Sequence, residues 1–142
     1  QIFVYEGIRI LGLGGSMRYR PGTNQYTERE MKKRVSKLWF PLLRRGGFDI
    51  LVTHSPAYQL GDGRDLPHQG FRTFVDLMDK YHPRYLLHGH VHLTYGRSVK
   101  RFDKYGDTTI INGYERFVFD YEADEPSSLK YGIEPGSPNP FA

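Results

Sequence analysis

The sequence predicts an α/β fold, and three observations lead to that class. An apolar segment over residues 48–53 is followed by a helical pattern over 70–82 and by a second apolar segment over 84–87. Strand, helix and strand in this order form a βαβ unit, whose two strands run parallel. Near the start of the chain, a glycine turn separates two further strand-like segments. Three short segments within 94–121 are typical of strands and predict a terminal β meander.

The first half of the chain has the pattern of a hairpin followed by a helix. Residues 2–5 and 8–13 are expected to pair as antiparallel strands around Glu6 and Gly7. Thr27 and Glu30 have the spacing of a capping box, which predicts a helix start at this point. Pro41 should end or kink that helix near Phe40. The apolar positions expected on its buried face are Met31, Val35, Leu38, Trp39 and Leu42.

The second half places an aperiodic loop before the βαβ helix. Residues 57–68 show no periodicity, and a loop of this length is more often functional than a simple connection. Its acidic residues Asp62 and Asp65 are expected to be solvated. Gln69 or Gly70 should begin the helix, which ends before Pro83. The strands of the meander are expected over 94–102, 108–111 and 116–121.

Composition restricts the classes of protein that this chain can represent. Its 142 residues fit one domain, and the absence of cysteine excludes disulfides, thiolate zinc sites and a cysteine nucleophile. The net charge of +4 suits an anionic substrate, a phosphate or a nucleic acid. Nucleic acid is the less favoured partner, because the basic residues cluster over 29–45 among apolar ones, as on a solvated helix face. With neither a membrane-length apolar run nor a signal peptide, we expect a cytoplasmic protein without membrane contact.

Histidines gather where the predicted parallel strands end. His88, His90 and His92 account for three of the six histidines, and His54 follows the other strand of the βαβ unit. The carboxyl ends of parallel strands meet at one edge of a sheet, where α/β proteins bind ligands. Imidazole is the commonest protein ligand for metals, so the sequence predicts a metal site there. On an extended segment, His90 and His92 would point to the same side.

The other histidines and one arginine are candidates for supporting roles. His88 would project to the opposite side of the segment, as a core residue or as support for the ligands. His68 precedes a helix and suits either a cap or a substrate contact. Gly12, Gly14 and Gly15 open a loop whose spacing fits no phosphate-binding motif, although Arg18 in that loop is a possible contact for an anionic substrate.

The segments Thr53-His54-Ser55-Pro56 and Gly89-His90-Val91-His92 resemble the last two signature blocks of the calcineurin-like metallophosphoesterases. The wider run, from the opening hairpin through Gly14 to Phe117, is similar to an uncharacterised bacterial branch of that superfamily. The resemblance implies a four-layer α/β/β/α sandwich that hydrolyses phosphate esters with two divalent metal ions, of manganese, iron, zinc or nickel. His54 and His90 would correspond to ligands of one metal, and His92 to a ligand of the other.

None of the first three signature blocks of that family, Asp-x-His, Gly-Asp and Gly-Asn-His, occurs ahead of His54 in this chain. By resemblance they carry the aspartate that bridges the metals, the asparagine ligand and the general acid. We therefore expect residues 1–121 to be the C-terminal portion of one domain, followed by a proline-rich acidic tail over 122–142. The N-terminal half would be truncated, cleaved or a separate chain. No catalytic residue is then expected here, and we predict little activity for this chain alone.

Two other interpretations stay open from the sequence. Three histidines with an open position for water form the ligand set of some mononuclear zinc hydrolases. Alternatively, the basic segment could serve a non-catalytic module that binds nucleic acid or another polyanion. Metal stoichiometry and the salt dependence of binding separate these interpretations from a dinuclear phosphoesterase.

Overall fold

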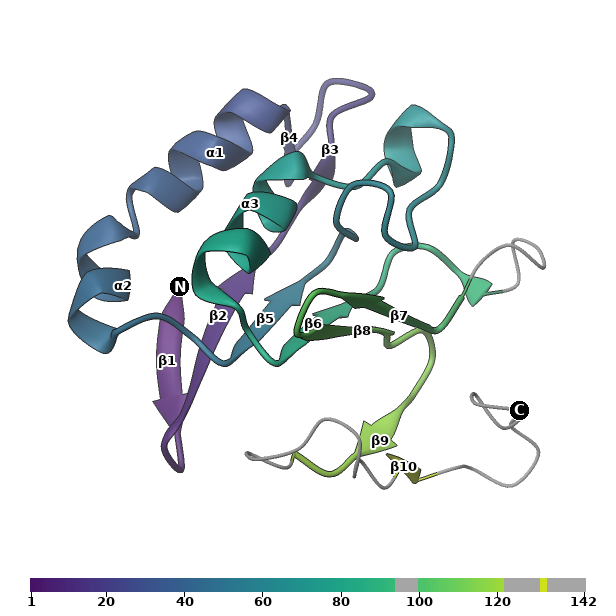
Figure 1. The fold of residues 1–142 in the computed structure, drawn as a ribbon. Coiled ribbons are helices and arrows are strands. Elements are labelled where there is room, and N and C mark those ends of the chain that lie inside the picture. Colours follow the sequence, from purple (N-terminus) through teal and green to yellow (C-terminus); the bar gives the residue numbers. More distant parts are fainter. Residues whose placement is uncertain (94–99, 122–130, 133–142) are drawn as a thin grey trace.

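The computed structural model describes residues 1–93, 100–121 and 131–132, and it has a mixed six-stranded sheet at its centre (Figure 1). The strand order is β1-β2-β5-β6-β8-β7. Four parallel strands form the middle: β2 (Ile8–Leu13), β5 (Ile50–Thr53), β6 (Tyr85–His88) and β8 (Thr108–Asn112). The antiparallel strands β1 (Ile2–Tyr5) and β7 (Phe102–Tyr105) form the edges. The predicted α/β class and βαβ unit are confirmed.

The predicted N-terminal hairpin is also confirmed, with the predicted boundaries. Its two turn residues both have positive φ, 47° at Glu6 and 80° at Gly7. A two-residue turn with positive φ at both positions matches the right-handed twist of the strands that it joins.

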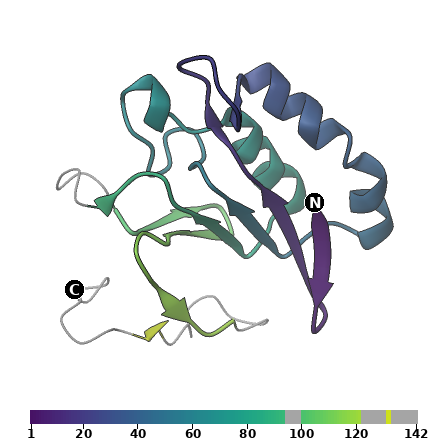
Figure 2. The same ribbon diagram turned by 180° about the vertical axis from the view of Figure 1, so that it is seen from behind.

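Three helices, α1 (Glu28–Ser36), α2 (Trp39–Arg45) and α3 (Arg72–Tyr81), cover one face of the sheet, as Figures 1 and 2 show from opposite sides. A 3-10 turn, η1 (Leu66–His68), precedes α3. The main hydrophobic core lies between sheet and helices. It includes Leu11, Leu51, Leu86 and Ile110 from the strands and Met31, Leu42, Phe74 and Met78 from the helices.

The other face of the sheet is covered unevenly. Ile50, Tyr85 and Ile111 are buried there, next to aromatic residues of the segment 117–121. Val52 lies in the centre of the same sheet, yet its side chain is 39% exposed. Parallel sheets are normally covered on both faces, so the exposure of Val52 is unusual for a central strand.

The first helical segment is interrupted, as Pro41 predicts, but between Ser36 and Trp39 rather than near Phe40. The capping box at Thr27 is confirmed, with Glu30 and Thr27 bonded in both directions. The helix is broken after Ser36. In a continuous helix the ring of Pro41 would clash with the carbonyl of Lys37, four residues earlier. Pro41 instead sits in the first turn of α2, where its missing N–H leaves no hydrogen bond unmade. The placement of Trp39 in the core was wrong, since it is 64% exposed.

The predicted terminal meander was also wrong. The strands β7 and β8 do form a hairpin, but β8 lies parallel to β6 inside the sheet. The third strand, β9 (Val118–Phe119), pairs with β10 (Tyr131–Gly132) in a separate sheet. The reason is burial: Ile110 and Ile111 are both buried, on opposite faces of β8, and only an interior position buries both.

The sequence predicted neither every strand of the structure nor only segments that the structure describes. The loop after β2 contains a short parallel pair, β3 (Ser16–Met17) and β4 (Gln25–Tyr26), which the sequence did not predict. The strand expected over 94–102 and the tail over 122–142 fall largely outside the described residues. Among the helices that the structure describes, none has the length and apolar character to cross a membrane.

Candidate metal centre

His54 and His90 lie together where β5 and β6 end. Because β5 and β6 are parallel neighbours, the segments that follow them leave the sheet at the same edge. The Gly89 N–H donates to the His54 carbonyl at 3.0 Å, which joins the two exits. His54 Nε2 is 2.9 Å from His90 Nδ1. Partial burial and the neighbouring His90 both lower the pKa of His54, so the neutral ring is favoured.

A backbone carbonyl fixes the orientation and tautomer of His90. Its Nε2 is 2.7 Å from the carbonyl oxygen of Pro67, which can only accept, so Nε2 carries a proton. In the neutral ring, Nδ1 then has a free lone pair, which accepts from the Nε2–H of His54. Metal-binding histidines almost always donate their other N–H to a carbonyl or carboxylate in this way. The lone pair of His90 Nδ1 therefore faces away from the Pro67 carbonyl and toward His54, where it could bind a metal ion.

The separation of the two nitrogens suits a shared metal ion. With metal–nitrogen bonds of about 2.0–2.1 Å, two ligands at a right angle lie about 2.9 Å apart, and tetrahedral ligands about 3.4 Å apart. The observed 2.9 Å fits the first arrangement as it stands and the second after a small movement. To bind, His54 has to carry its proton on Nδ1 rather than on Nε2.

His92 does not join this pair. The extended conformation on which His90 and His92 were expected to share one side is absent: His90 has a φ of 64° and the Val91 N–H donates to the Gly89 carbonyl at 2.7 Å. The ring of His92 instead lies against Tyr114, with centroids 4.6 Å apart. In the described part of the chain, no three His, Asp or Glu side chains are placed to hold a metal ion.

Asn112, at the end of β8, holds the turn that carries His90. Its side chain is fully buried, its Nδ2 donates to the Val91 carbonyl at 2.7 Å, and its Oδ1 accepts from the Tyr114 N–H. The Gly113 N–H adds a bond to the His88 carbonyl. Asn112 was not among the predicted site residues. A buried amide directly after an apolar strand is the signal that could have identified it.

The loop between β5 and α3 brings His68 beside the histidine pair. Its ring centroid is 5.0 Å from that of His90, and its Nδ1–H donates to Asp65 at 2.6 Å. This hydrogen bond lowers the pKa of Asp65. Asp65 is exposed to solvent, as expected, and it is also paired with His68. An Asp–His pair of this type fixes the ring, which suits the predicted substrate contact.

Close backbone packing holds that loop closed. A side chain at Gly70 would place its Cβ 2.3 Å from the Ala57 carbonyl, a distance that only glycine avoids. The Gly70 N–H donates to Asp62 at 3.0 Å, so Asp62 is also engaged rather than only solvated. Gly89 behaves differently, because a Cβ there would lie at an ordinary 3.9 Å from the His54 carbonyl. A close approach of another backbone segment therefore does not explain why position 89 is glycine.

His88 and Arg18 lie outside the ligand positions. His88 is buried, and burial lowers its pKa to about 4, so it is neutral near pH 7. Arg18 pairs with Glu30 at 3.1 Å and donates to the Gln25 carbonyl. The guanidinium of Arg18, a possible contact for an anionic substrate, thus already has an acidic partner.

Two solved structures share this fold. The crystal structure of TT1561 of Thermus thermophilus has a TM-score of 0.58 and 16% sequence identity, over 92% of this chain and 56% of that one. A second crystal structure has a TM-score of 0.56 and 16% identity, over 81% of this chain and 44% of that one. The likeness is one of fold. The chain spans about half the length of the structures that it matches, and no family model and no curated protein matches it.

Proposed function

We propose that this chain contributes part of the active site of a metal-dependent phosphoesterase. His54 and His90 would bind one divalent metal ion and His92 a second, and phosphate monoesters or diesters would be the substrates. The observation that supports this most strongly is the pair of facing nitrogens, His54 Nε2 and His90 Nδ1, 2.9 Å apart at the carboxyl edge of parallel strands.

The roles of the surrounding residues follow from their positions. His68, held by Asp65 beside His90, would contact the substrate or the leaving group. For His92 to act as a ligand, its side chain has to turn from Tyr114 toward the histidine pair. Manganese, iron, zinc and nickel all accept imidazole together with oxygen ligands, so each is a candidate metal. When bound, the metals would polarise the phosphoryl oxygen and supply an activated water.

A further segment would complete the site. The resemblance to calcineurin-like enzymes implies an N-terminal half with the bridging aspartate and the general acid, either in a longer chain or as a separate partner. The exposed Val52 in the centre of the sheet supports this, because a second sheet packed on that face would cover it. The finer architecture proposed is thus the four-layer α/β/β/α sandwich.

Metal affinity tests the ligand assignment directly. We expect His54→Ala and His90→Ala each to weaken binding of Mn²⁺ or Zn²⁺ by at least about tenfold, as measured by isothermal titration calorimetry. The matched control is His82→Asn, because His82 is exposed and caps α3 with a φ of 48° that asparagine tolerates. Equal affinities in all of these proteins would contradict the assignment.

Stoichiometry distinguishes the dinuclear centre from the mononuclear alternative. The ring centroid of His68 is 5.0 Å from that of His90, so His68 is a further candidate for the third ligand of the mononuclear alternative, although it has to move to reach a metal ion. Elemental analysis of the complete protein should find two ions per molecule for the proposed function. A single tightly bound ion, lost in a His68→Ala variant but not in His92→Ala, would favour the mononuclear hydrolase instead.

A further inference from the structure

Helix α2 presents three large apolar side chains to solvent. Trp39 is 64% exposed, Phe40 55% and Leu43 71%, whereas Leu42 on the opposite side is buried in the core. Position 43 is four residues after 39 and three after 40, and residues at these spacings are neighbours on a helix surface, so the three side chains form one continuous strip. The rings of Trp39 and Phe40 touch, with centroids 5.7 Å apart. Contiguous exposed apolar surface of this kind usually marks a contact site.

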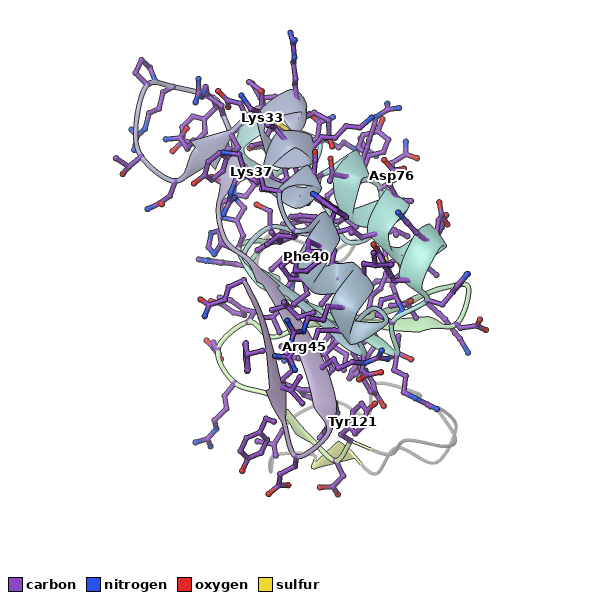
Figure 3. The ribbon with its side chains drawn as sticks, turned by 90° about the vertical axis from the view of Figure 1, so that its left-hand side faces the viewer. Lys33, Lys37, Phe40, Arg45, Asp76 and Tyr121 are labelled. Carbon is purple, nitrogen blue, oxygen red and sulfur yellow. The ribbon has the colours of Figure 1, made fainter. Side chains whose placement is uncertain are left out.

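Basic side chains precede and follow this strip along α1 and α2. Residues 28–45 contain seven basic and two acidic residues, a net charge of +5, whereas the whole chain carries +4. Both acidic residues are engaged, Glu28 with the N-terminus of α3 and Glu30 with Thr27 and Arg18. The exposed cations are Arg29, Lys32, Lys33, Lys37, Arg44 and Arg45. Figure 3 views this face, with Lys33, Lys37, Phe40 and Arg45 following one another along α1 and α2.

We propose that this basic-apolar face, formed by the exposed cations and by Trp39, Phe40 and Leu43, binds the surface of an anionic phospholipid bilayer. Tryptophan, phenylalanine and leucine are the side chains that amphipathic helices insert into the boundary between headgroups and acyl chains. Lysine and arginine beside them remain at the level of the lipid phosphates, with their alkyl chains along the apolar surface. The expectation of no membrane contact rested on the absence of a spanning helix, which a surface contact does not need.

A bilayer fits this face better than a nucleic acid does. Sites for single strands combine aromatic side chains with a groove that follows the backbone, and duplex readers present polar side chains to base edges. Here the most exposed residue of the strip is Leu43, which can neither stack on a base nor donate a hydrogen bond. In Figure 1, α2 and η1 lie on opposite sides of the molecule, so a bound bilayer leaves the histidine edge accessible.

Trp39 is the only tryptophan of the chain, and its fluorescence therefore reports on this face alone. The test compares vesicles of phosphatidylcholine with vesicles that also contain phosphatidylglycerol. Sedimentation measures how much protein binds to each kind of vesicle, and emission spectra measure the environment of Trp39. We expect the protein to sediment with the anionic vesicles only, with a blue shift of the Trp39 emission. Raising the salt from low to high concentration should release the protein, because the charge attraction is screened.

Two variant pairs connect the binding to the named side chains. Phe40→Ala/Leu43→Ala keeps the fluorescent reporter and should weaken vesicle binding by about tenfold or more. Its control, Tyr5→Ala, removes a 64% exposed aromatic side chain elsewhere and should leave binding unchanged. Lys33→Gln/Lys37→Gln should weaken binding by about tenfold or more, whereas Lys80→Gln on α3 should not. All of these positions are on the surface, so the fold is retained.

Several results would overturn the proposal. One is an absence of binding to anionic vesicles, and another is binding without a change in the Trp39 emission. Sedimentation that is equal for the wild-type chain and Phe40→Ala/Leu43→Ala would also reject it. Binding of a single-stranded oligonucleotide with quenching of Trp39, but no vesicle binding, would assign the face to a polyanion. Self-association in gel filtration that disappears in Phe40→Ala/Leu43→Ala, again without vesicle binding, would assign it to a second copy.

Discussion

His90 has a left-handed backbone conformation and a ring that the Pro67 carbonyl holds at 2.7 Å. Its φ of 64° lies in the left-handed region, which costs a residue other than glycine about 1–2 kcal/mol. Hydrogen bonds around it, from Val91 N–H to the Gly89 carbonyl and from Asn112 to the Val91 carbonyl, hold this conformation. The same conformation directs Nδ1 at His54. Backbone strain that the surroundings enforce is typical of functional sites.

This strain predicts an inverted order of stability for two substitutions. Both His90→Ala and His90→Gly remove the ring and its hydrogen bonds, so they differ only in backbone preference. Glycine normally lowers stability relative to alanine by about 0.5–1 kcal/mol. At His90 we expect His90→Gly to be more stable than His90→Ala by about 1 kcal/mol, as measured by urea unfolding with a chelator present. The usual order would show that the turn is not strained.

His88 makes the stability of the fold sensitive to pH. Its pKa is about 4 in the folded protein and near 6.5 in the unfolded chain, because burial disfavours the charged ring. Between these values the unfolded chain binds a proton that the folded protein does not. The free energy of unfolding is therefore independent of this group above pH 6.5, and it falls by about 3 kcal/mol in total as the pH drops toward 4.

Urea unfolding at a series of pH values, in chelator, measures this loss. His54, whose pKa is also lowered, contributes in the same direction. A His88→Leu variant should lose most of the dependence between pH 6.5 and 4, whereas His82→Asn should keep it. An unchanged slope in His88→Leu would mean that other groups cause the acid sensitivity.

At the scale of elements, α1 supplies the missing cap of α3. Phe71 precedes α3 and offers no capping side chain. Glu28, in the first turn of α1, accepts hydrogen bonds from the Arg72 N–H at 3.0 Å and from the Thr73 N–H at 2.7 Å. A carboxylate at this end of the helix also interacts favourably with the helix dipole. Since α3 follows the loop with His68, this contact fixes one end of the site.

Replacing Glu28 tests how much this contact contributes. Glu28→Gln keeps the size of the side chain but removes the charge and one acceptor, so we expect the free energy of unfolding to fall by about 1–2 kcal/mol. Glu6→Gln, at the exposed tip of the β1–β2 hairpin, serves as the control and should change little. Thermal unfolding followed by circular dichroism measures both. Equal stability of the two variants would contradict a capping role.

The elements that could be predicted are those determined by local chemistry. The turn at Glu6-Gly7, the capping box at Thr27 and the βαβ unit depend on neighbouring residues, and all three are present. The errors arise where tertiary burial decides. Helical spacing alone could not show that Trp39 turns to solvent after the break, nor that β8 would take an interior position beside β6.

The same division applies to the candidate site. The approach of His54 to His90 follows from parallel topology, which the sequence pattern indicates. The separation of His92 from the His54–His90 pair depends on the turn at His90. That residue has a positive φ although it is not glycine, and no sequence pattern predicts such a turn. The contacts of Pro67, Asp65 and Asn112 were missed because they join segments far apart in the chain, or lie in segments without periodicity.

For the molecule as a whole, charge balance decides whether two metal ions can bind to this chain alone. Two doubly charged ions about 4 Å apart repel by about 17 kcal/mol at an effective dielectric constant of about 20. Neutral imidazoles cannot offset that repulsion. The two carboxylates of the loop between β5 and α3 are already engaged, Asp62 by Gly70 and Asp65 by His68. A dinuclear centre therefore needs further carboxylates, which the proposed N-terminal half would supply.

This charge balance predicts that the 142-residue chain binds metal weakly and does not turn over substrate. With Mn²⁺ present, hydrolysis of p-nitrophenyl phosphate should not exceed that of buffer with the same metal, although the chain still unfolds cooperatively. Because His54 and His90 already face each other, it should bind one ion, with an affinity that His90→Ala reduces. Metal-dependent turnover that His92→Ala abolishes would instead mean that Asp62 or Asp65 can leave its partner and replace the bridging aspartate.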